Sequence, residues 1–282
     1  MLPASLAVIG LGAIGGSLAW QARLRGVPRV VGYSPLAAEG VLALKAGAVT
    51  ELADTPRRAV AGSDLIVLAV PPNVTLELIT LLAAHLDRGA VLTDVCSVKA
   101  AVIERAVVSG VGDNFAGAHP LAGTHESGFE SARPDRLRGC VTYICESGTA
   151  RGHLAAQRVA GFWERTLEAA PILISAVAHD RQLAWTSHLP QAVAYALART
   201  LANQGLAGVS YGSGAKDTTR LAASSPEMWL DVFSLNAVPV TEALRLMEGA
   251  LAELRHSLER RDVEALEAYL ESAQAFRRAL DR

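Results

Sequence analysis

The sequence predicts an α/β protein with a doubly wound, parallel sheet in its N-terminal part and an all-helical C-terminal part. Three observations support this. Short apolar runs alternate with helical patterns in the first half, a glycine-rich turn follows the first apolar run, and only helical patterns occur after about residue 176. Strand–helix–strand alternation is typical of a sheet covered by helices on both faces. We expect one domain over residues 1–175 and a second over residues 176–282.

Continuously apolar runs in the first half are expected to be strands, because both faces of a parallel sheet are buried. These runs are Leu6–Gly10, Val30–Tyr33, Leu65–Val70, Val91–Val95, Phe115–Ala118 and Val141–Cys145, with Pro171–Ser175 as a candidate last strand. Helical patterns at Ile14–Arg25 and Leu76–His85 lie between them.

The second part of the chain shows signals of helices only. The segment Arg181–Ala202 is apolar nearly all round, which predicts a buried helix. Ser225 before Pro226 predicts a helix N-terminus, and two later apolar stripes at helical spacing begin at Val240 and at Val263, the latter after the N-cap Asp262. A helix buried on every side in a small domain predicts a homodimer formed through this domain.

Composition excludes several classes of protein. Of the 282 residues, 51% are hydrophobic and 19% are charged, which excludes a disordered chain. The formal net charge of -2 provides no overall positive field for nucleic acid or an anionic membrane. The three cysteines form no CxxC pair, so we expect no disulfide framework, no metal site and a cytoplasmic location. Residues 1–22 are uncharged, but without a basic start they fit a buried strand and a glycine turn better than a signal peptide.

The glycine turn has the spacing GxGxxG directly after the first predicted strand. It comprises Gly10, Leu11, Gly12, Ala13, Ile14 and Gly15. In a dinucleotide-binding domain of the Rossmann type, the first glycine allows the tight turn, the second lets the backbone approach a pyrophosphate, and the third allows helix and strand to pack closely. A purely structural turn is the alternative. The agreement of strand, turn and helix favours a dinucleotide site, with Val70 and Pro71 at the end of a neighbouring strand beside it.

The end of the second predicted strand bears on the choice between NAD and NADP. An acid there would bond the ribose 2′-hydroxyl of NAD. This chain has Ser34 instead, which tolerates a 2′-phosphate, although no arginine follows directly. Arg57 and Arg58 are candidates to approach that phosphate or simply solvated surface charges. We expect a slight preference for NADP, with NAD as the alternative.

Candidate catalytic residues follow two other predicted strands. His119 follows Phe115–Ala118, at the sheet edge where open α/β sheets bind ligands, and could accept a proton as hydride leaves a substrate. A structural histidine is the alternative. Ser97 and Lys99 follow Val91–Val95, and Ser97 is also expected to contact the cofactor. Ser97 could bond the imidazole or cap the helix that starts near Lys99, and Lys99 could bind a carboxylate.

Several motifs in order resemble the prephenate/arogenate (cyclohexadienyl) dehydrogenase family, from about residue 6 to at least residue 236. They are Gly10–Gly15, Asp94 with Ser97-Val98-Lys99, His119-Pro120-Leu121-Ala122-Gly123-Thr124, Ser127-Gly128, His179-Asp180, Ser187-His188-Leu189-Pro190, Lys216-Asp217 with Thr219-Arg220, and Ser225-Pro226-Glu227-Met228-Trp229. The resemblance implies NAD(P)-dependent oxidative decarboxylation in tyrosine biosynthesis, with loss of hydride and CO2 from a cyclohexadienol as its ring becomes aromatic.

The resemblance also implies roles for individual residues. His119 would take the proton of the C4 hydroxyl, Ser97 would position both groups, and Arg220 would bind a substrate carboxylate, unless it only pairs with Asp217 at the surface. The expected substrate-binding set is Arg220, His188, Gln191, His125, Thr124 and Lys99. At His125 and Gln191 this chain departs from the common family pattern, which leaves the choice between prephenate and arogenate open.

Two other functions remain as alternatives at this point. One is a β-hydroxyacid type of NAD(P) dehydrogenase, for which Lys216 is the sole candidate lysine in the helical part. The other is a non-catalytic NADP-binding sensor, which would need only the glycine turn.

Overall fold

The computed structural model describes residues 2–123, 127–204 and 208–280. The chain packs as two compact units, Met1–Asn236 and Ala237–Arg282. The domain boundary expected between residues 175 and 176 stays a prediction.

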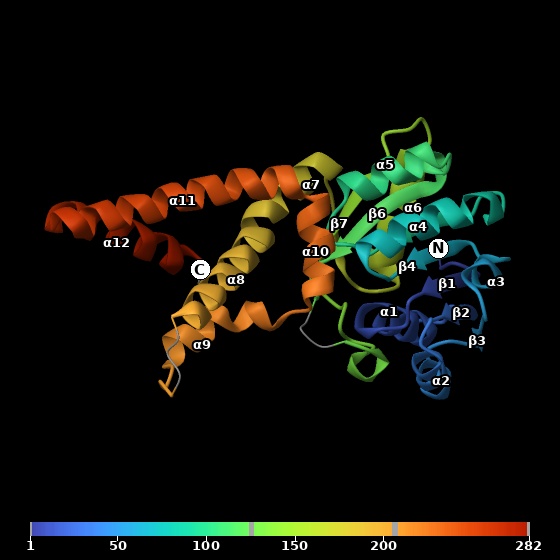
Figure 1. Ribbon diagram of the computed structural model, residues 1–282. Coiled ribbons are helices and arrows are strands. Elements are labelled where there is room, and N and C mark those ends of the chain that lie inside the picture. The colour runs from blue at the N-terminus through green and yellow to red at the C-terminus, as the bar shows by residue number, and fades with distance from the viewer. Residues whose placement is uncertain (1, 124–126, 205–207, 281–282) are drawn as a thin grey trace. The chain divides into compact units, whose positions relative to one another are not determined.

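The first unit is built on one sheet in the order β3-β2-β1-β4-β5-β6-β7-β8 (Figure 1). The strands are β1 (Ser5–Ile9), β2 (Arg29–Tyr33), β3 (Glu51–Leu52), β4 (Leu65–Leu68), β5 (Val91–Asp94), β6 (Phe115–Pro120), β7 (Val141–Glu146) and β8 (Ala170–Leu173). Neighbours from β3 to β6 run parallel, and β7 pairs antiparallel with β6. All seven predicted strands are confirmed. Strand β3 was not predicted, because it has only two residues, both exposed, and forms no apolar run.

The antiparallel pairing of β7 differs from the purely parallel sheet that the apolar runs favour. A parallel crossover needs a connection long enough to hold a helix. In the described part of the β6–β7 connection, the only helical element is the three-residue η3 (Phe129–Ser131). The chain therefore turns back at the carboxyl end of β6, and Pro120 pairs with Thr142.

Helices cover both faces of the sheet, as predicted (Figure 1). They are α1 (Ala13–Leu24), α2 (Ala37–Lys45), α3 (Pro56–Val60), α4 (Pro72–Leu82), α5 (Ala100–Val108) and α6 (Gly152–Arg165), with short turns η1 (Ala83–His85) and η2 (Gly112–Asn114). Alternate residues of β1 point to opposite faces. Leu6 and Val8 pack in a core with α1 and α6, and Ala7 and Ile9 in a core with α3, α4 and α5.

The helical segment at the end of the first unit is more broken than predicted. It contains α7 (Ala176–Leu183), the π turn η4 (Ala184–His188), α8 (Leu189–Asn203), α9 (Ser213–Thr219), η5 (Arg220–Ala223) and α10 (Pro226–Leu235). The predicted helix Arg181–Ala202 is helical throughout, with a π turn inside it, but the burial expected on all its sides is wrong for the single chain. Pro190 has no N–H for helical bonding and a π turn precedes it, while Trp185 is 42% exposed. The predicted N-cap is confirmed, because the Ser225 side chain accepts from the Met228 amide.

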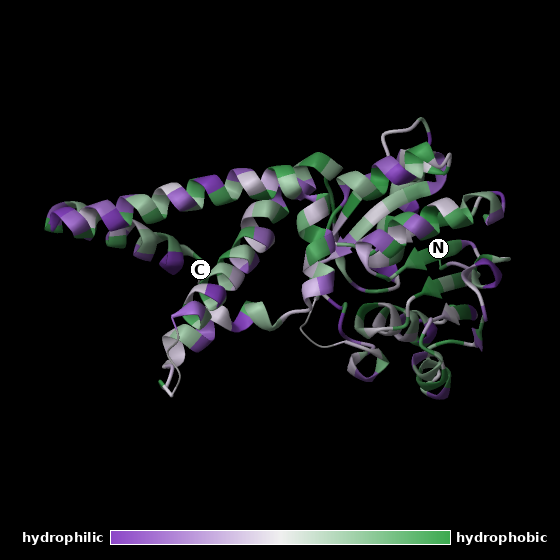
Figure 2. Ribbon diagram, in the orientation of Figure 1, coloured by the Kyte–Doolittle hydropathy of each residue, from purple (hydrophilic) through white to green (hydrophobic). Residues whose placement is uncertain are grey.

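The second unit comprises the long helices α11 (Ala237–Arg260) and α12 (Val263–Ala279). Asp262 is the predicted N-cap of α12, and its carboxylate accepts from the Ala265 amide at 3.0 Å. Hydrophobic residues recur along both helices (Figure 2). Many are exposed in the single chain, among them Val238, Leu246 and Phe276. Among the residues that the structure describes, no helix is both long and apolar enough to cross a membrane.

Candidate active site

The glycine turn between β1 and α1 forms a cradle at the carboxyl edge of the sheet. Gly10 has a φ of +98°, and a Cβ there would lie 2.2 Å from the Ala69 oxygen. A Cβ on Gly15 would lie 1.9 Å from the Gly10 oxygen. Gly12, by contrast, faces open space, with the Gly128 nitrogen 4.0 Å from an ideal Cβ, and no side chain caps α1. The uncapped N–H groups at this helix N-terminus therefore fit a pyrophosphate.

The remaining predicted cofactor residues surround this cradle. The Leu11 side chain is fully buried below the turn, where a Cβ on Gly32 would meet it at 2.9 Å. Val70 contacts the turn, since its Cγ1 would lie 2.9 Å from a Cβ on Gly10, and Pro71 is the N-cap of α4. Leu11 thus packs its side chain in the core, while Ala13 and Ile14 are half-buried.

A carboxylate that sequence reasoning missed lies at the end of β2. The Ser34 hydroxyl donates to Glu39 Oε2 at 2.6 Å, and Glu39 Oε1 would lie 3.7 Å from a Cβ on Gly128. Glu39 belongs to the first turn of α2, five residues after Ser34 in sequence, so a search for an acid at the strand end does not find it. Arg58 instead pairs with Asp54, at the exposed surface.

Three residues form a hydrogen-bonded chain at the carboxyl end of β6. His119 Nδ1 lies 2.9 Å from His179 Nε2, and His179 Nδ1 lies 2.7 Å from Asp180 Oδ1. The two rings meet edge to face, with centroids 5.1 Å apart. Asp180 is itself held in place, because its carboxylate accepts from the backbone amides of Lys99 and Ala100 at the start of α5.

The chain of bonds determines which nitrogens carry protons. A carboxylate only accepts, so the proton of neutral His179 lies on Nδ1 and its Nε2 accepts. His119 must then donate from Nδ1, which leaves its Nε2 unprotonated. His119 is 9% exposed, whereas His179 is fully buried. His119, the less completely buried of the two rings, thus carries a free acceptor, which is the state that a general base requires.

Burial keeps these imidazoles neutral. Burial lowers the pKa of His119 well below its ordinary value of 6.5, and the neighbouring His179, Lys99 and His188 lower it further. Burial also lowers the pKa of His179, although its bond to Asp180 opposes this shift. At neutral pH both rings therefore carry one proton each.

Lys99 and Ser97 are placed differently from the roles predicted for them. Lys99 is fully buried, and its ammonium pairs with Asp94 and donates to the Ala118 oxygen. The Lys99 ammonium is already engaged by the Asp94 carboxylate and the Ala118 oxygen, so carboxylate binding by Lys99 does not fit its position. Ser97 is half-buried, and Asp180 rather than Ser97 caps α5. The expected capping role of Ser97 is therefore wrong.

The Arg220 segment is anchored to α8 by two hydrogen bonds. The Gln191 amide donates to the Leu221 oxygen at 2.7 Å, and the Tyr195 hydroxyl donates to the Ser224 oxygen at 3.0 Å. Arg220 is exposed, and within the described residues it forms no ion pair with Asp217. Gln191 is buried, and its side-chain amide is used on the backbone of this segment.

His188 lies at the end of η4 and is fully buried. Its Nδ1 lies 3.0 Å from Asn236 Nδ2, and its ring meets Trp229 edge to face with centroids 5.9 Å apart. Burial lowers the pKa of His188 to about 4. Thr124 and His125, the other two residues expected to bind substrate, lie outside the described residues.

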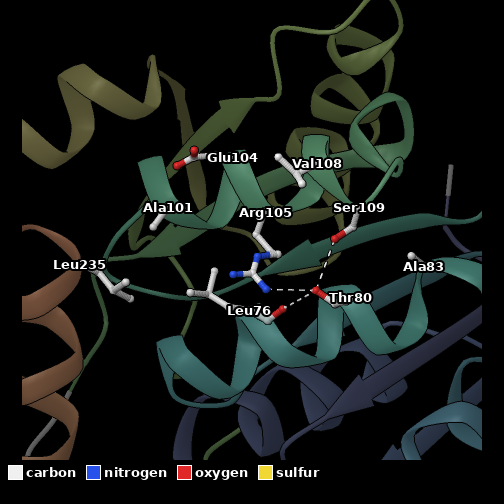
Figure 3. Close-up of a pocket in the computed structure, with 9 residues that line it drawn as sticks. All are labelled: Leu76, Thr80, Ala83, Ala101, Glu104, Arg105, Val108, Ser109 and Leu235. Atoms are coloured by element: carbon white, nitrogen blue, oxygen red, sulfur yellow. Dashed lines mark hydrogen bonds between the residues drawn. The ribbon is translucent and has the colours of Figure 1, made fainter.

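A separate cavity of about 590 Å³ lies between α4 and α5 (Figure 3). Thr80 is at its centre, where Arg105 donates to its hydroxyl at 3.3 Å. Leu235 of α10 lines one end. None of the predicted site residues lines this cavity, so it is distinct from the histidine cluster.

Comparison with known proteins identifies the family of this chain. Residues 18–169 match the sequence profile of the family described as "Prephenate dehydrogenase, nucleotide-binding domain", and residues 175–272 match "Prephenate dehydrogenase, dimerization domain". The prephenate dehydrogenase of Lactococcus lactis is 29% identical over 97% of this chain and 77% of its own length.

Solved structures are similar over almost the whole chain. The prephenate dehydrogenase of Aquifex aeolicus, in complex with hydroxyphenyl propionate and NAD+, has a TM-score of 0.90 and is 28% identical, over 98% of each chain. The arogenate dehydrogenase of Synechocystis has a TM-score of 0.81 and is 27% identical, over 98% of this chain and 99% of its own.

The glycine cradle and the sheet around it, together with these matches, define an NAD(P)-dependent oxidoreductase. The chain belongs to the prephenate dehydrogenase family, whose two domain profiles match it in succession.

Proposed function

We propose that this protein catalyses the oxidative decarboxylation of prephenate, of arogenate or of both, in tyrosine biosynthesis. The observation that carries the proposal is the chain from Asp180 through His179 to His119, which leaves an unprotonated Nε2 at the sheet edge that binds dinucleotides. Names of relatives support both substrates, since prephenate, cyclohexadienyl and arogenate dehydrogenases are all among them.

In the proposed reaction, His119 Nε2 accepts the proton of the C4 hydroxyl while the C4–H bond releases its electron pair as hydride. The bound nicotinamide supplies the hydride acceptor. The bond between the ring and its carboxylate then breaks, its electron pair completes the aromatic ring, and CO2 leaves. The new phenolic oxygen recovers the proton from His119. His179 and Asp180 hold the imidazole in the required tautomer and stabilise its transient positive charge.

Other residues are proposed to bind and orient the substrate. Arg220 is exposed and its guanidinium has the planar fork that suits a carboxylate. His188 donates from Nε2 to an oxygen of the substrate. Ser97 lies on the loop after β5, where it orients the C4 hydroxyl of the substrate. Lys99 is assigned a different part. Its buried pair with Asp94 and its bond to the Ala118 oxygen brace the residue that precedes His119.

Cofactor preference is the finer part of this proposal. The sequence favours NADP at Ser34, but the placement of Glu39 argues against this preference. A carboxylate that accepts from Ser34 can also accept from a ribose 2′-hydroxyl, and it would repel a 2′-phosphate. We therefore propose that NAD is preferred.

The proposal includes a homodimer and a cytoplasmic location. Exposed apolar side chains on α11 and α12 support the dimer, as does the family description of residues 175–272 as a dimerization domain. The two profile matches also support the predicted division near residue 175.

A four-way assay tests the function. Prephenate and arogenate are each offered with NAD+ and with NADP+, and reduced nicotinamide and released CO2 are measured together. The proposal predicts equal amounts of both products with at least one pair. Cofactor reduction without CO2 would instead indicate a β-hydroxyacid type of dehydrogenase. No reduction with either substrate, in a protein that binds the cofactor, would indicate a sensor.

A further inference from the structure

Asn236 makes two hydrogen bonds that settle its orientation. Its Nδ2 donates to the backbone oxygen of Asp180 at 2.8 Å and lies 3.0 Å from His188 Nδ1. A backbone carbonyl can only accept, so the amide NH2 group, and not the amide oxygen, faces both partners. His188 Nδ1 must therefore accept the second amide proton and carries no proton of its own.

The opposite nitrogen of His188 has no partner. A neutral ring with an unprotonated Nδ1 carries its proton on Nε2. The His188 ring is fully buried, and within the described residues its Nε2 forms no hydrogen bond. An unpaired buried donor is costly to the folded protein, and such groups are often completed by a ligand.

We propose that Asn236 is a positioning residue that locks His188 as an Nε2–H donor for an acceptor oxygen of the substrate, a carboxylate or a carbonyl. This inference rests on the proposed function for the identity of the ligand. His188 and His119 then have opposite roles. His119 presents a lone pair, whereas His188 presents a proton.

Asp180 anchors both arrangements. Its carboxylate orients His179 and through it His119, and its backbone oxygen orients the amide of Asn236. One residue thus couples the acceptor to the donor. Asn236 is 3% exposed and directly follows α10, whose N-cap bond at Ser225 fixes where that helix begins.

The direct test is the tautomer of His188, read from the side-chain ¹⁵N chemical shifts of histidine-labelled protein, with His188→Gln to assign the signal. The inference predicts a protonated Nε2 and an unprotonated Nδ1 in the wild-type protein at neutral pH. The reverse pattern, or a charged ring, would overturn it. This measurement needs no substrate and no Asn236 variant, so its outcome is independent of the proposed function.

A binding experiment tests the consequence. Asn236→Asp replaces the donating amide with a carboxylate that only accepts, so the His188 proton should move to Nδ1. Calorimetry with hydroxyphenyl propionate in the presence of NAD+ should show binding weakened about tenfold or more, and NAD+ affinity unchanged. In a His188→Ala background, Asn236→Asp should cost no further affinity. An equal loss in both backgrounds would show that Asn236 does not act through His188.

Discussion

His119 Nδ1 and His179 Nε2 lie 2.9 Å apart, which joins the end of β6 to α7 through two neutral imidazoles. Because Asp180 accepts from the far side of His179, the proton positions follow from the geometry. The relationship explains how a buried histidine can act as a base. It also makes the protonation of His119 Nε2 depend on His179 and Asp180.

We call the hydrogen-bonded chain of Asp180, His179 and His119 the relay. If it holds His119 in the basic form, His179→Gln and Asp180→Asn should lower turnover and leave NAD(P) binding intact. An asparagine at position 180 can donate toward His179 and reverse its tautomer, which would place a proton on His119 Nε2. We expect kcat to fall on the order of 10²-fold or more, the usual contribution of a general base. Asp113→Asn, an exposed acid on η2, is the matched control. A kcat for both relay variants within twofold of the control would contradict the relay.

Folding stability should decrease as the pH falls below about 6.5. The pKa values of His119, His179 and His188 are lower in the folded protein than in the unfolded chain, so the unfolded chain binds more protons in this range. Stability is therefore fully present above the unfolded pKa and is lost on acidification. For His188 alone the loss is roughly 1–2 kcal/mol at about pH 5.

Urea unfolding from neutral to acidic pH checks this expectation. His188→Gln should flatten the acid slope, because glutamine does not titrate, whereas His153→Gln on the exposed side of α6 should leave it unchanged. An identical slope in wild type and His188→Gln would show that His188 is not buried in its neutral form.

Much of the fold was predictable because its signals are local. Buried parallel strands are continuous apolar runs, and the caps Ser225 and Asp262 bond amides three residues away. The hydrogen-bonded chain of Asp180, His179 and His119 was only partly predictable. His119 stands at a strand end in the sequence, but its contact with His179 spans 60 residues and depends on how α7 packs. Glu39 and Asn236 carry no sequence signal, since their roles arise from partners met only in the folded chain.

Cofactor choice should depend on Glu39. Fluorescence titration should show tighter binding of NADH than of NADPH to the wild-type protein, because the carboxylate beside Ser34 repels a 2′-phosphate. Glu39→Gln should reduce this discrimination by about tenfold, a change of roughly 1.4 kcal/mol. Glu77→Gln on the exposed side of α4 is the control. Tighter binding of NADPH by the wild type would restore the expectation drawn from Ser34.

Arg220→Ala should raise the Michaelis constant for the carboxylate substrate. Loss of a bidentate guanidinium–carboxylate pair predicts a decrease in kcat/KM of about tenfold to a hundredfold, and Arg220→Lys should restore only part of it. Arg199→Ala, at an exposed position on α8, controls for the loss of surface charge. If neither KM nor kcat changes in Arg220→Ala, the carboxylate role is wrong.

The most direct test of the account is turnover by His119→Asn, measured with whichever substrate and cofactor pair the wild-type protein uses. Asparagine keeps a polar group at the end of β6 but offers no basic nitrogen. The account predicts unchanged binding of NAD(P)H and a loss of turnover on the order of 10²-fold or more. Turnover close to that of the wild-type protein would contradict the assignment of His119 as the base.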